Sequence, residues 1–128
     1  MTDTLVAFLR ARLDDDEQVA GAADPELSHV FTRIATFDPE MAADERHIMV
    51  QRPARTLREV QAKRQLIDEH RPDGAGGCST CTDPEDFDED ADGNRAFSRS
   101  AKPWPCPTVR LLALPYSDHL DYRQEWTP

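Results

Sequence analysis

The chain has 128 residues, of which 38% are hydrophobic and 31% charged, and its formal net charge is -10. This length fits a single domain over residues 1–128, and no run of about 20 apolar residues marks a membrane span. The negative charge argues against direct binding to nucleic-acid phosphates or anionic lipid, whereas a basic protein partner is compatible with it.

The first predicted element is a helix over residues 3–22. Asp3 or Thr4 can cap its N-terminus by accepting backbone N–H groups. Its apolar positions recur at i, i+3, i+4 and i+8, which makes one stripe: Leu5, Phe8, Leu9 and Leu13. The carboxylates of residues 14–17 point in different directions on a helix, so we expect a solvated face there and no common ion site.

Two further segments carry a helix-start signal, an aspartate followed by a proline at the first helical position. The first predicts a helix over residues 24–34, although residues 30–34 are also β-prone and a strand is the alternative. The second predicts a helix over residues 38–50.

The clearest predicted helix spans residues 53–70 and begins at Pro53. Leu57, Val60 and Ile67 share one apolar face. The helix also carries a group of basic side chains: Arg55, Arg58, Lys63 and Arg64. These could bind an anion, but the overall negative charge favours a role in offsetting the acidic residues downstream.

Glycine, proline and acidic residues dominate residues 71–93. Residues 83–92 hold seven carboxylates and no basic side chain, so we predict a flexible, acidic, Cys-containing loop over residues 72–105. A last helix is predicted from Pro107, with a short buried strand as the alternative. Together the elements indicate a mainly α fold: a small single domain of three to five short helices with a metal-pinned Cys/His loop.

Four residues form a candidate metal centre: His70, Cys78, Cys81 and Cys106. The C-x-x-C pair can place two thiolates on one edge of an ion, and the cysteines are all those in the chain. Zinc takes four nitrogen or sulfur ligands in a tetrahedron, so the set predicts a structural zinc. The histidine is chosen by exclusion. His119 is the rival fourth ligand, and His47 is a more distant one.

Other chemistries for these residues are less favoured. The same ligands could hold an iron–sulfur cluster. A thioredoxin-like pair lacks its βαβ surroundings, and a zinc deaminase would need the proline-flanked cysteine within the C-x-x-C. Residues 88–93 resemble the start of a calcium loop, but position 12 is Arg99 and not the bidentate glutamate, so a solvated loop is expected.

Four segments stand out together: Leu5–Leu13, Arg52–Arg64, Cys78–Cys81 and Pro105–Tyr116, followed by Asp118-His119 and Asp121–Arg123. As a set they resemble a family of small uncharacterised proteins of actinobacteria and their phages. The resemblance covers residues 22–45 and the acidic loop poorly. It implies a cytoplasmic bacterial or phage setting and is consistent with the His/Cys set as a family feature. It transfers no catalytic residue.

The sequence favours a non-enzymatic protein-interaction or regulatory module with a structural zinc and an unknown protein partner. The aromatic tail, Tyr116, Tyr122 and Trp126, either contacts that partner or packs on the domain's own core. Two alternatives stay open: a redox or iron–sulfur sensor that uses Cys78 and Cys81, and an acidic decoy of nucleic acid that binds a basic protein. No motif pairs a base with a nucleophile, so no enzyme is predicted. A basic leader is absent and a C-x-x-C pair is present, which favours the cytoplasm.

Overall fold

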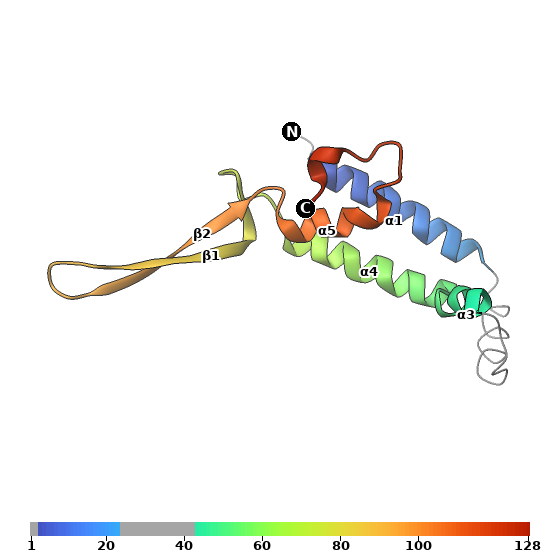
Figure 1. Cartoon of the computed structure of the whole chain (residues 1–128), viewed down its shortest axis with the longest axis horizontal. Coiled ribbons are helices and arrows are strands. Elements are labelled where there is room, and N and C mark those ends of the chain that lie inside the picture. The colour runs from blue at the N-terminus through green and yellow to red at the C-terminus, as the bar shows by residue number, and fades with distance from the viewer. Residues whose placement is uncertain (1–2, 24–42) are drawn as a thin grey trace. The chain divides into compact units, whose positions relative to one another are not determined.

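The computed structural model describes residues 3–23 and 43–128 (Figure 1). The predicted helix over residues 24–34 and the start of the one predicted over 38–50 lie outside these ranges. The described elements are the helices α1 (Thr4–Ala22), α3 (Ala43–Val50), α4 (Pro53–Glu69) and α5 (Pro107–Ala113), the strands β1 (Gly77–Glu89) and β2 (Arg95–Pro103), and the short 3₁₀ helices η1 (Leu114–Tyr116) and η2 (Gln124–Trp126).

The chain divides into two compact units, residues 9–64 and residues 1–8 with 65–128. Its assignment to a single domain therefore stays a prediction.

In the unit of residues 9–64, the apolar stripe predicted for the first helix is buried. Leu9 and Leu13 are 1% and 0% exposed. The acidic residues beside them are not merely solvated: Arg64 on α4 pairs with Asp14 at 2.6 Å and Glu17 at 2.5 Å. Hydrogen bonds to Glu17 and Asp14 raise the pKa of Arg64 above its ordinary value. Arg64 thus offsets the acidic turn of α1, and not the acidic segment downstream as the sequence analysis expected.

In the other unit, the first turn of α1 begins at the capping residue predicted for it. The Oδ1 atom of Asp3 accepts the backbone N–H groups of Leu5 at 3.0 Å and Val6 at 3.2 Å. Satisfying these otherwise unpaired donors stabilises a helix start by about 1 kcal/mol. Leu5 is 1% exposed, so the cap also fixes the entry of α1 into the core of this unit.

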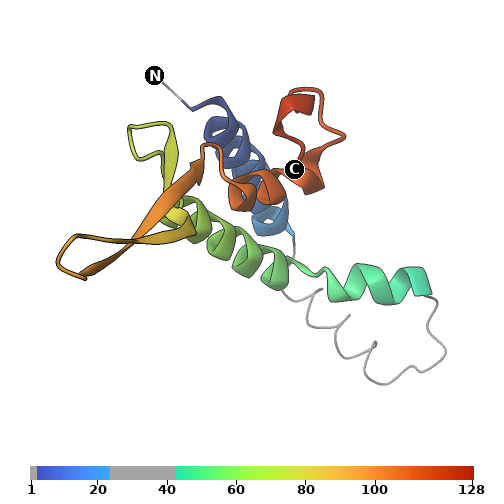
Figure 2. The ribbon, with the colours of Figure 1, turned by 60° about the vertical axis from the view of Figure 1, so that its left-hand side comes forward.

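Where the sequence predicts an acidic loop, residues 77–103 form an antiparallel hairpin of β1 and β2. Thr82 lies opposite Ala101, and the register shifts on both sides of residues 82–84. In Figures 1 and 2 the tip of the hairpin lies away from α5. The expectation of a mainly α fold is therefore right only in part, because a two-stranded sheet accompanies the four described helices.

The hairpin turn is built on Asp90. Its Oδ1 atom accepts the backbone N–H groups of Asp92 and Asn94, both at 2.9 Å. Gly93 has φ +80°, a conformation that side chains disfavour. Hydrogen bonds from Asn94 lower the pKa of Asp90. The segment considered as a calcium loop thus ends in a hairpin turn whose central carboxylate is already hydrogen-bonded to its own backbone.

Aromatic rings around Phe8 form much of the core of this unit. Phe8 is 6% exposed, and its ring centroid lies 5.1 Å from that of Trp126, which is 5% exposed. Three further rings meet Phe8 edge-on, at 5.6–6.4 Å: Tyr116, His119 and Tyr122. Of the two readings of the aromatic tail, packing on the domain's own core is the one this geometry supports. Over the described ranges, no helix is long and apolar enough to cross a membrane.

Candidate metal centre

His70 follows the last residue of α4. Its backbone N–H donates to Leu66 O at 3.1 Å, which continues the helical pattern by one residue. The hydroxyl of Thr80 donates to the carbonyl of Glu69 and so ties the end of α4 to the start of β1. The half-buried imidazole of His70 is thereby held beside the first residues of the hairpin.

A glycine-rich loop brings the chain from His70 into β1 (Figure 2). The Oδ1 atom of Asp73 accepts the backbone N–H groups of Ala75 at 2.7 Å and Gly77 at 3.0 Å. Gly77 also lies against β2: a Cβ atom at this position would stand 2.6 Å from Ala101 Cβ. Only a residue without a side chain lets the two strands approach so closely, and this approach sets Cys78 at the base of the hairpin.

Cys106 enters from the other end of the hairpin. It is the N-cap of α5, with an extended backbone at φ -72° and ψ 161°, and Pro107 follows at the first helical position. Its carbonyl accepts the backbone N–H of Arg110 at 3.1 Å. The side chain is 0% exposed, so the start of α5 points the Cys106 thiol into the interior of this unit.

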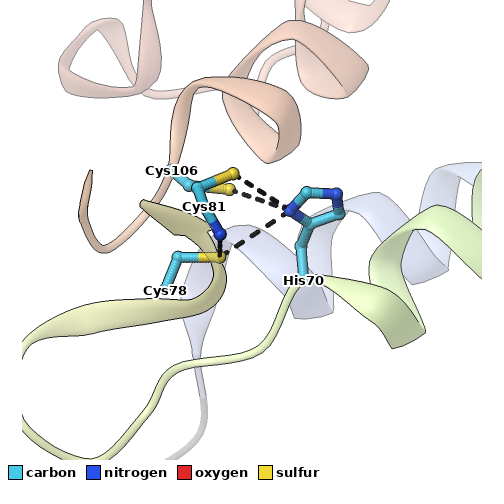
Figure 3. A group of neighbouring side chains, drawn as sticks. All are labelled: His70, Cys78, Cys81 and Cys106. Atoms are coloured by element: carbon cyan, nitrogen blue, oxygen red, sulfur yellow. Dashed lines mark hydrogen bonds between the residues drawn. The ribbon is translucent and has the colours of Figure 1, made fainter. Parts of the chain in front are cut away.

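The four residues predicted from the sequence meet around His70 (Figure 3). The Sγ atoms of Cys78, Cys81 and Cys106 lie 3.7, 3.3 and 3.7 Å from its Nδ1 atom. All four ligand atoms lie within 4.8 Å of one another. Zinc bonds of about 2.0–2.3 Å in a tetrahedron place neighbouring ligands about 3.5–3.8 Å apart. The donor set and its spacing therefore fit a single metal ion.

Backbone N–H groups point at one of the sulfur atoms. Those of Thr80 and Cys81 lie 3.5 and 3.4 Å from Cys78 Sγ. Burial, the largest single influence, raises the pKa of Cys78. These two N–H groups, with the side chains of His70 and Cys106, outweigh it and lower the pKa to about 7. The tight turn thus favours the thiolate form that binds metals.

The pKa of the Cys106 thiol shifts in the opposite direction. Burial is the main reason that the pKa of Cys106 rises to about 11, and the nearby Cys78 raises it further, although the backbone N–H of Val109 lowers it. When one buried thiol ionises, its charge suppresses ionisation of its neighbours. A divalent cation among them removes this conflict, because its charge stabilises all the thiolates at once.

The two other histidines considered as ligands, His119 and His47, are not part of this cluster. His119 packs against Phe8, and its Nδ1 atom accepts the backbone N–H of Asp121 at 3.0 Å. His47 is exposed on α3, in the other unit. Within the described ranges, the group around His70 is the one cluster with the spacing of a metal site.

Two threonines that the sequence pattern did not single out support the centre. The hydroxyl of Thr80 holds the end of α4, as described above. The hydroxyl of Thr108 lies 3.9 Å from Cys81 Sγ. Each threonine is a near neighbour of a cysteine, at the third position of the C-x-x-C and two residues after Cys106. That proximity is the signal that could have identified them, because residues beside metal ligands commonly orient them.

Comparison with known proteins gives a family but no activity. A family described as of unknown function, DUF6221, matches residues 2–128. No curated protein and no solved structure matches the chain.

Proposed function

Since the chain belongs to the DUF6221 family of unknown function, its role has to be argued from the site, and we propose that His70, Cys78, Cys81 and Cys106 bind one structural zinc ion. The observation that carries this proposal is the separation of the four ligand atoms, all within 4.8 Å of one another. Three thiolates and one imidazole are a common structural zinc set.

The compactness of the centre favours one ion over an iron–sulfur cluster. Ligand atoms this close together enclose room for a single ion, whereas several irons and bridging sulfides hold their ligands further apart. Zinc is the commoner occupant of a Cys₃His set. A purified protein that carried iron and sulfide, and was coloured for that reason, would reverse this preference and favour the redox or iron–sulfur sensor.

A structural role is favoured over a catalytic one by ligand number and burial. Catalytic zinc keeps a coordination position open for water or substrate, whereas four protein ligands close the shell. Cys78 is 1% exposed and Cys106 is 0% exposed, so two of the ligands are out of reach of a substrate. The ion would join the end of α4 and the start of β1, which are close in sequence, to the start of α5, which is 36 positions from His70.

Native mass spectrometry of the protein purified without added metal tests the zinc proposal. We expect one zinc per chain in the wild type and none in the Cys78→Ser variant, with a lower Tm in the variant. Metal loss matters for stability because binding energy at a structural site is also folding energy. A wild type without zinc, even after addition of stoichiometric zinc, would contradict the proposal.

Around this centre we propose a non-enzymatic interaction or regulatory module of the cytoplasm, in an actinobacterial or phage setting. The cysteines form no disulfide among themselves, which is compatible with a reducing compartment. Residues 83–92 carry seven carboxylates. One of them, Asp83, is offset by an ion pair with Lys102 at 3.0 Å. The excess negative charge suits a protein partner with a basic surface, including the acidic-decoy alternative.

Charge neutralisation tests the partner proposal. The probe is a lysine- and arginine-rich peptide, and the variant replaces the seven carboxylates of residues 83–92 by asparagine and glutamine. We expect the wild type to bind the peptide in a salt-sensitive manner and the variant to bind it at least about tenfold more weakly. Equal binding by both proteins would exclude this segment as the basis of recognition.

A further inference from the structure

The carboxylate of Asp3 serves two segments that are far apart in the chain. Its Oδ1 atom caps α1, where it accepts the N–H groups of Leu5 and Val6. Its Oδ2 atom accepts the indole N–H of Trp104, 101 positions later. Hydrogen bonds to an ionised carboxylate are about twice as strong as neutral ones. Asp3 therefore ties the first turn of α1 to the segment between β2 and α5.

That segment belongs to the candidate metal centre. Trp104 stands two positions before Cys106, and its backbone N–H donates to Gly76 O at 3.0 Å. Gly76 in turn stands two positions before Cys78. The position of the Trp104 indole therefore depends on two stretches of chain that the metal ligands would hold together, one leading to each of two cysteines.

From this connection we infer that the Asp3–Trp104 hydrogen bond is a latch through which metal binding controls docking of the first turn of α1. The inference rests on the proposed zinc site. With an ion bound, Cys78 and Cys106 are held at one point, and Trp104 is presented to Asp3. When the ion leaves, the two stretches keep only the backbone contacts at the base of the hairpin, Trp104 N–H to Gly76 O and the pairing of Gly77 with Pro103. The indole then loses its fixed position and the latch opens.

The closed latch keeps a small apolar surface buried. Leu5 is 1% exposed and belongs to the turn of α1 that Asp3 caps. When the latch opens, this turn frays and Leu5 becomes accessible to solvent or to another protein. Metal loss is thereby converted into exposure of one end of α1, and metal binding into its burial.

Hydrogen exchange measured by NMR on the zinc-loaded and zinc-free protein tests the latch. The probes are the Trp104 indole N–H, assigned with a Trp104→Phe variant, and the backbone amides of residues 5–8. We expect zinc removal to speed exchange of both probes by about tenfold or more, the scale of one lost charge-assisted hydrogen bond. Zinc content is followed in the same samples, so a protein that binds no zinc would sink the proposed function separately from the latch.

Two variants distinguish the latch from a general loss of structure. Asp3→Asn keeps a good helix cap but replaces one carboxylate oxygen by an N–H donor. With zinc bound, it should exchange rapidly at the Trp104 indole and keep its zinc. Trp104→Phe should make exchange at residues 5–8 insensitive to zinc.

Three results of these exchange measurements would exclude the latch. The latch is excluded if exchange at residues 5–8 of the wild type is the same with and without bound zinc, or if Asp3→Asn leaves the indole protected. It is also excluded if zinc removal speeds exchange in residues 54–64 of α4 as much as in residues 5–8, because that result signifies global unfolding.

Discussion

The Sγ atom of Cys81 lies 3.3 Å from the Nδ1 atom of His70, although eleven positions separate the two residues. With Cys78 they form a local group of three ligands, held by the glycine-rich loop between α4 and β1. Cys106 is the remote member, 36 positions from His70. The pairing of Gly77 with Pro103 already brings the chain back to this group, so an ion would add a second closure to the one that the hairpin makes.

The two candidate histidines give a matched pair of variants. His70→Ala should weaken zinc binding by more than about 100-fold, because even residues that only orient a ligand are worth about 10- to 100-fold. His119→Ala should keep its zinc and lose only ring packing against Phe8, 5.6 Å away. Competition with a chromogenic chelator measures both affinities. Loss of zinc in His119→Ala together with retention in His70→Ala would reverse the ligand assignment.

The thiols of the zinc-free protein should titrate far apart. Cys78 has a pKa of about 7 and Cys106 one of about 11, on either side of the ordinary value of 9.0. A pH titration of the ultraviolet thiolate absorbance should therefore show one early and one late step. Cys78→Ser should abolish the early step, and an early step that survives this substitution would refute the assignment.

The same two thiols make the stability of the zinc-free protein depend on pH. Cys78 has a depressed pKa, so its contribution is complete above about pH 9 and is lost as the pH falls through 7. Cys106 has a raised pKa, so its contribution is complete below about pH 9 and is lost as the pH rises through 11. Urea unfolding should show that the free energy of unfolding of the wild type exceeds that of a variant with serine at both positions by the greatest amount near pH 9. A difference that does not change with pH would contradict this prediction.

Truncation of Phe8 tests the aromatic core. Phe8→Ala should lower the free energy of unfolding by about 3–5 kcal/mol, the usual cost of removing a buried aromatic ring. Leu120 is 99% exposed, so Leu120→Ala should change it by less than about 0.5 kcal/mol. Urea denaturation of the zinc-loaded proteins gives both values. Equal effects would mean that Phe8 is not part of the core.

Two glycine-to-alanine changes should have opposite effects. A Cβ atom at Gly77 would stand 2.6 Å from Ala101 Cβ and 2.8 Å from Asp73 Oδ2, so the hairpin must shift at a cost of about 1–3 kcal/mol. Since Cys78 is the next residue, zinc affinity should fall as well. Gly21, in α1, has open space where its Cβ would lie, and alanine there should stabilise the helix by up to about 1 kcal/mol. Thermal unfolding and chelator competition compare the two variants, and a Gly77→Ala protein as stable as the wild type would contradict the close approach of the strands.

Local sequence rules account well for the helices that the structure describes. Asp3 and Pro53 are start signals whose effect depends on the next few residues, and α1 and α4 begin at the places they indicate. The start of α5 at Pro107 confirms the helix predicted there over the alternative of a short buried strand. In each case the helix is decided by hydrogen bonds between residues close in sequence.

The hairpin was beyond such rules because its partner strands lie across a turn and carry no regular apolar alternation. Residues 83–92 are acidic almost throughout, a composition typical of loops. One signal was available: Asp92-Gly93 is a dipeptide that favours tight hairpin turns. For the candidate metal centre, residue type was sufficient to name four candidate ligands that the structure brings together, whereas the roles of the neighbouring threonines follow from their contacts.

The register pairs Gly77 with Pro103, so the two ends of the hairpin lie beside the candidate metal ligands. The segment from about Thr82 to Ala101 is consequently an arm whose two ends lie close together. Residues can be added to or removed from its turn in pairs without altering the path between the ligands. Such an arm can change in length while the centre at its base stays the same, and in the laboratory it offers a place to graft a foreign peptide.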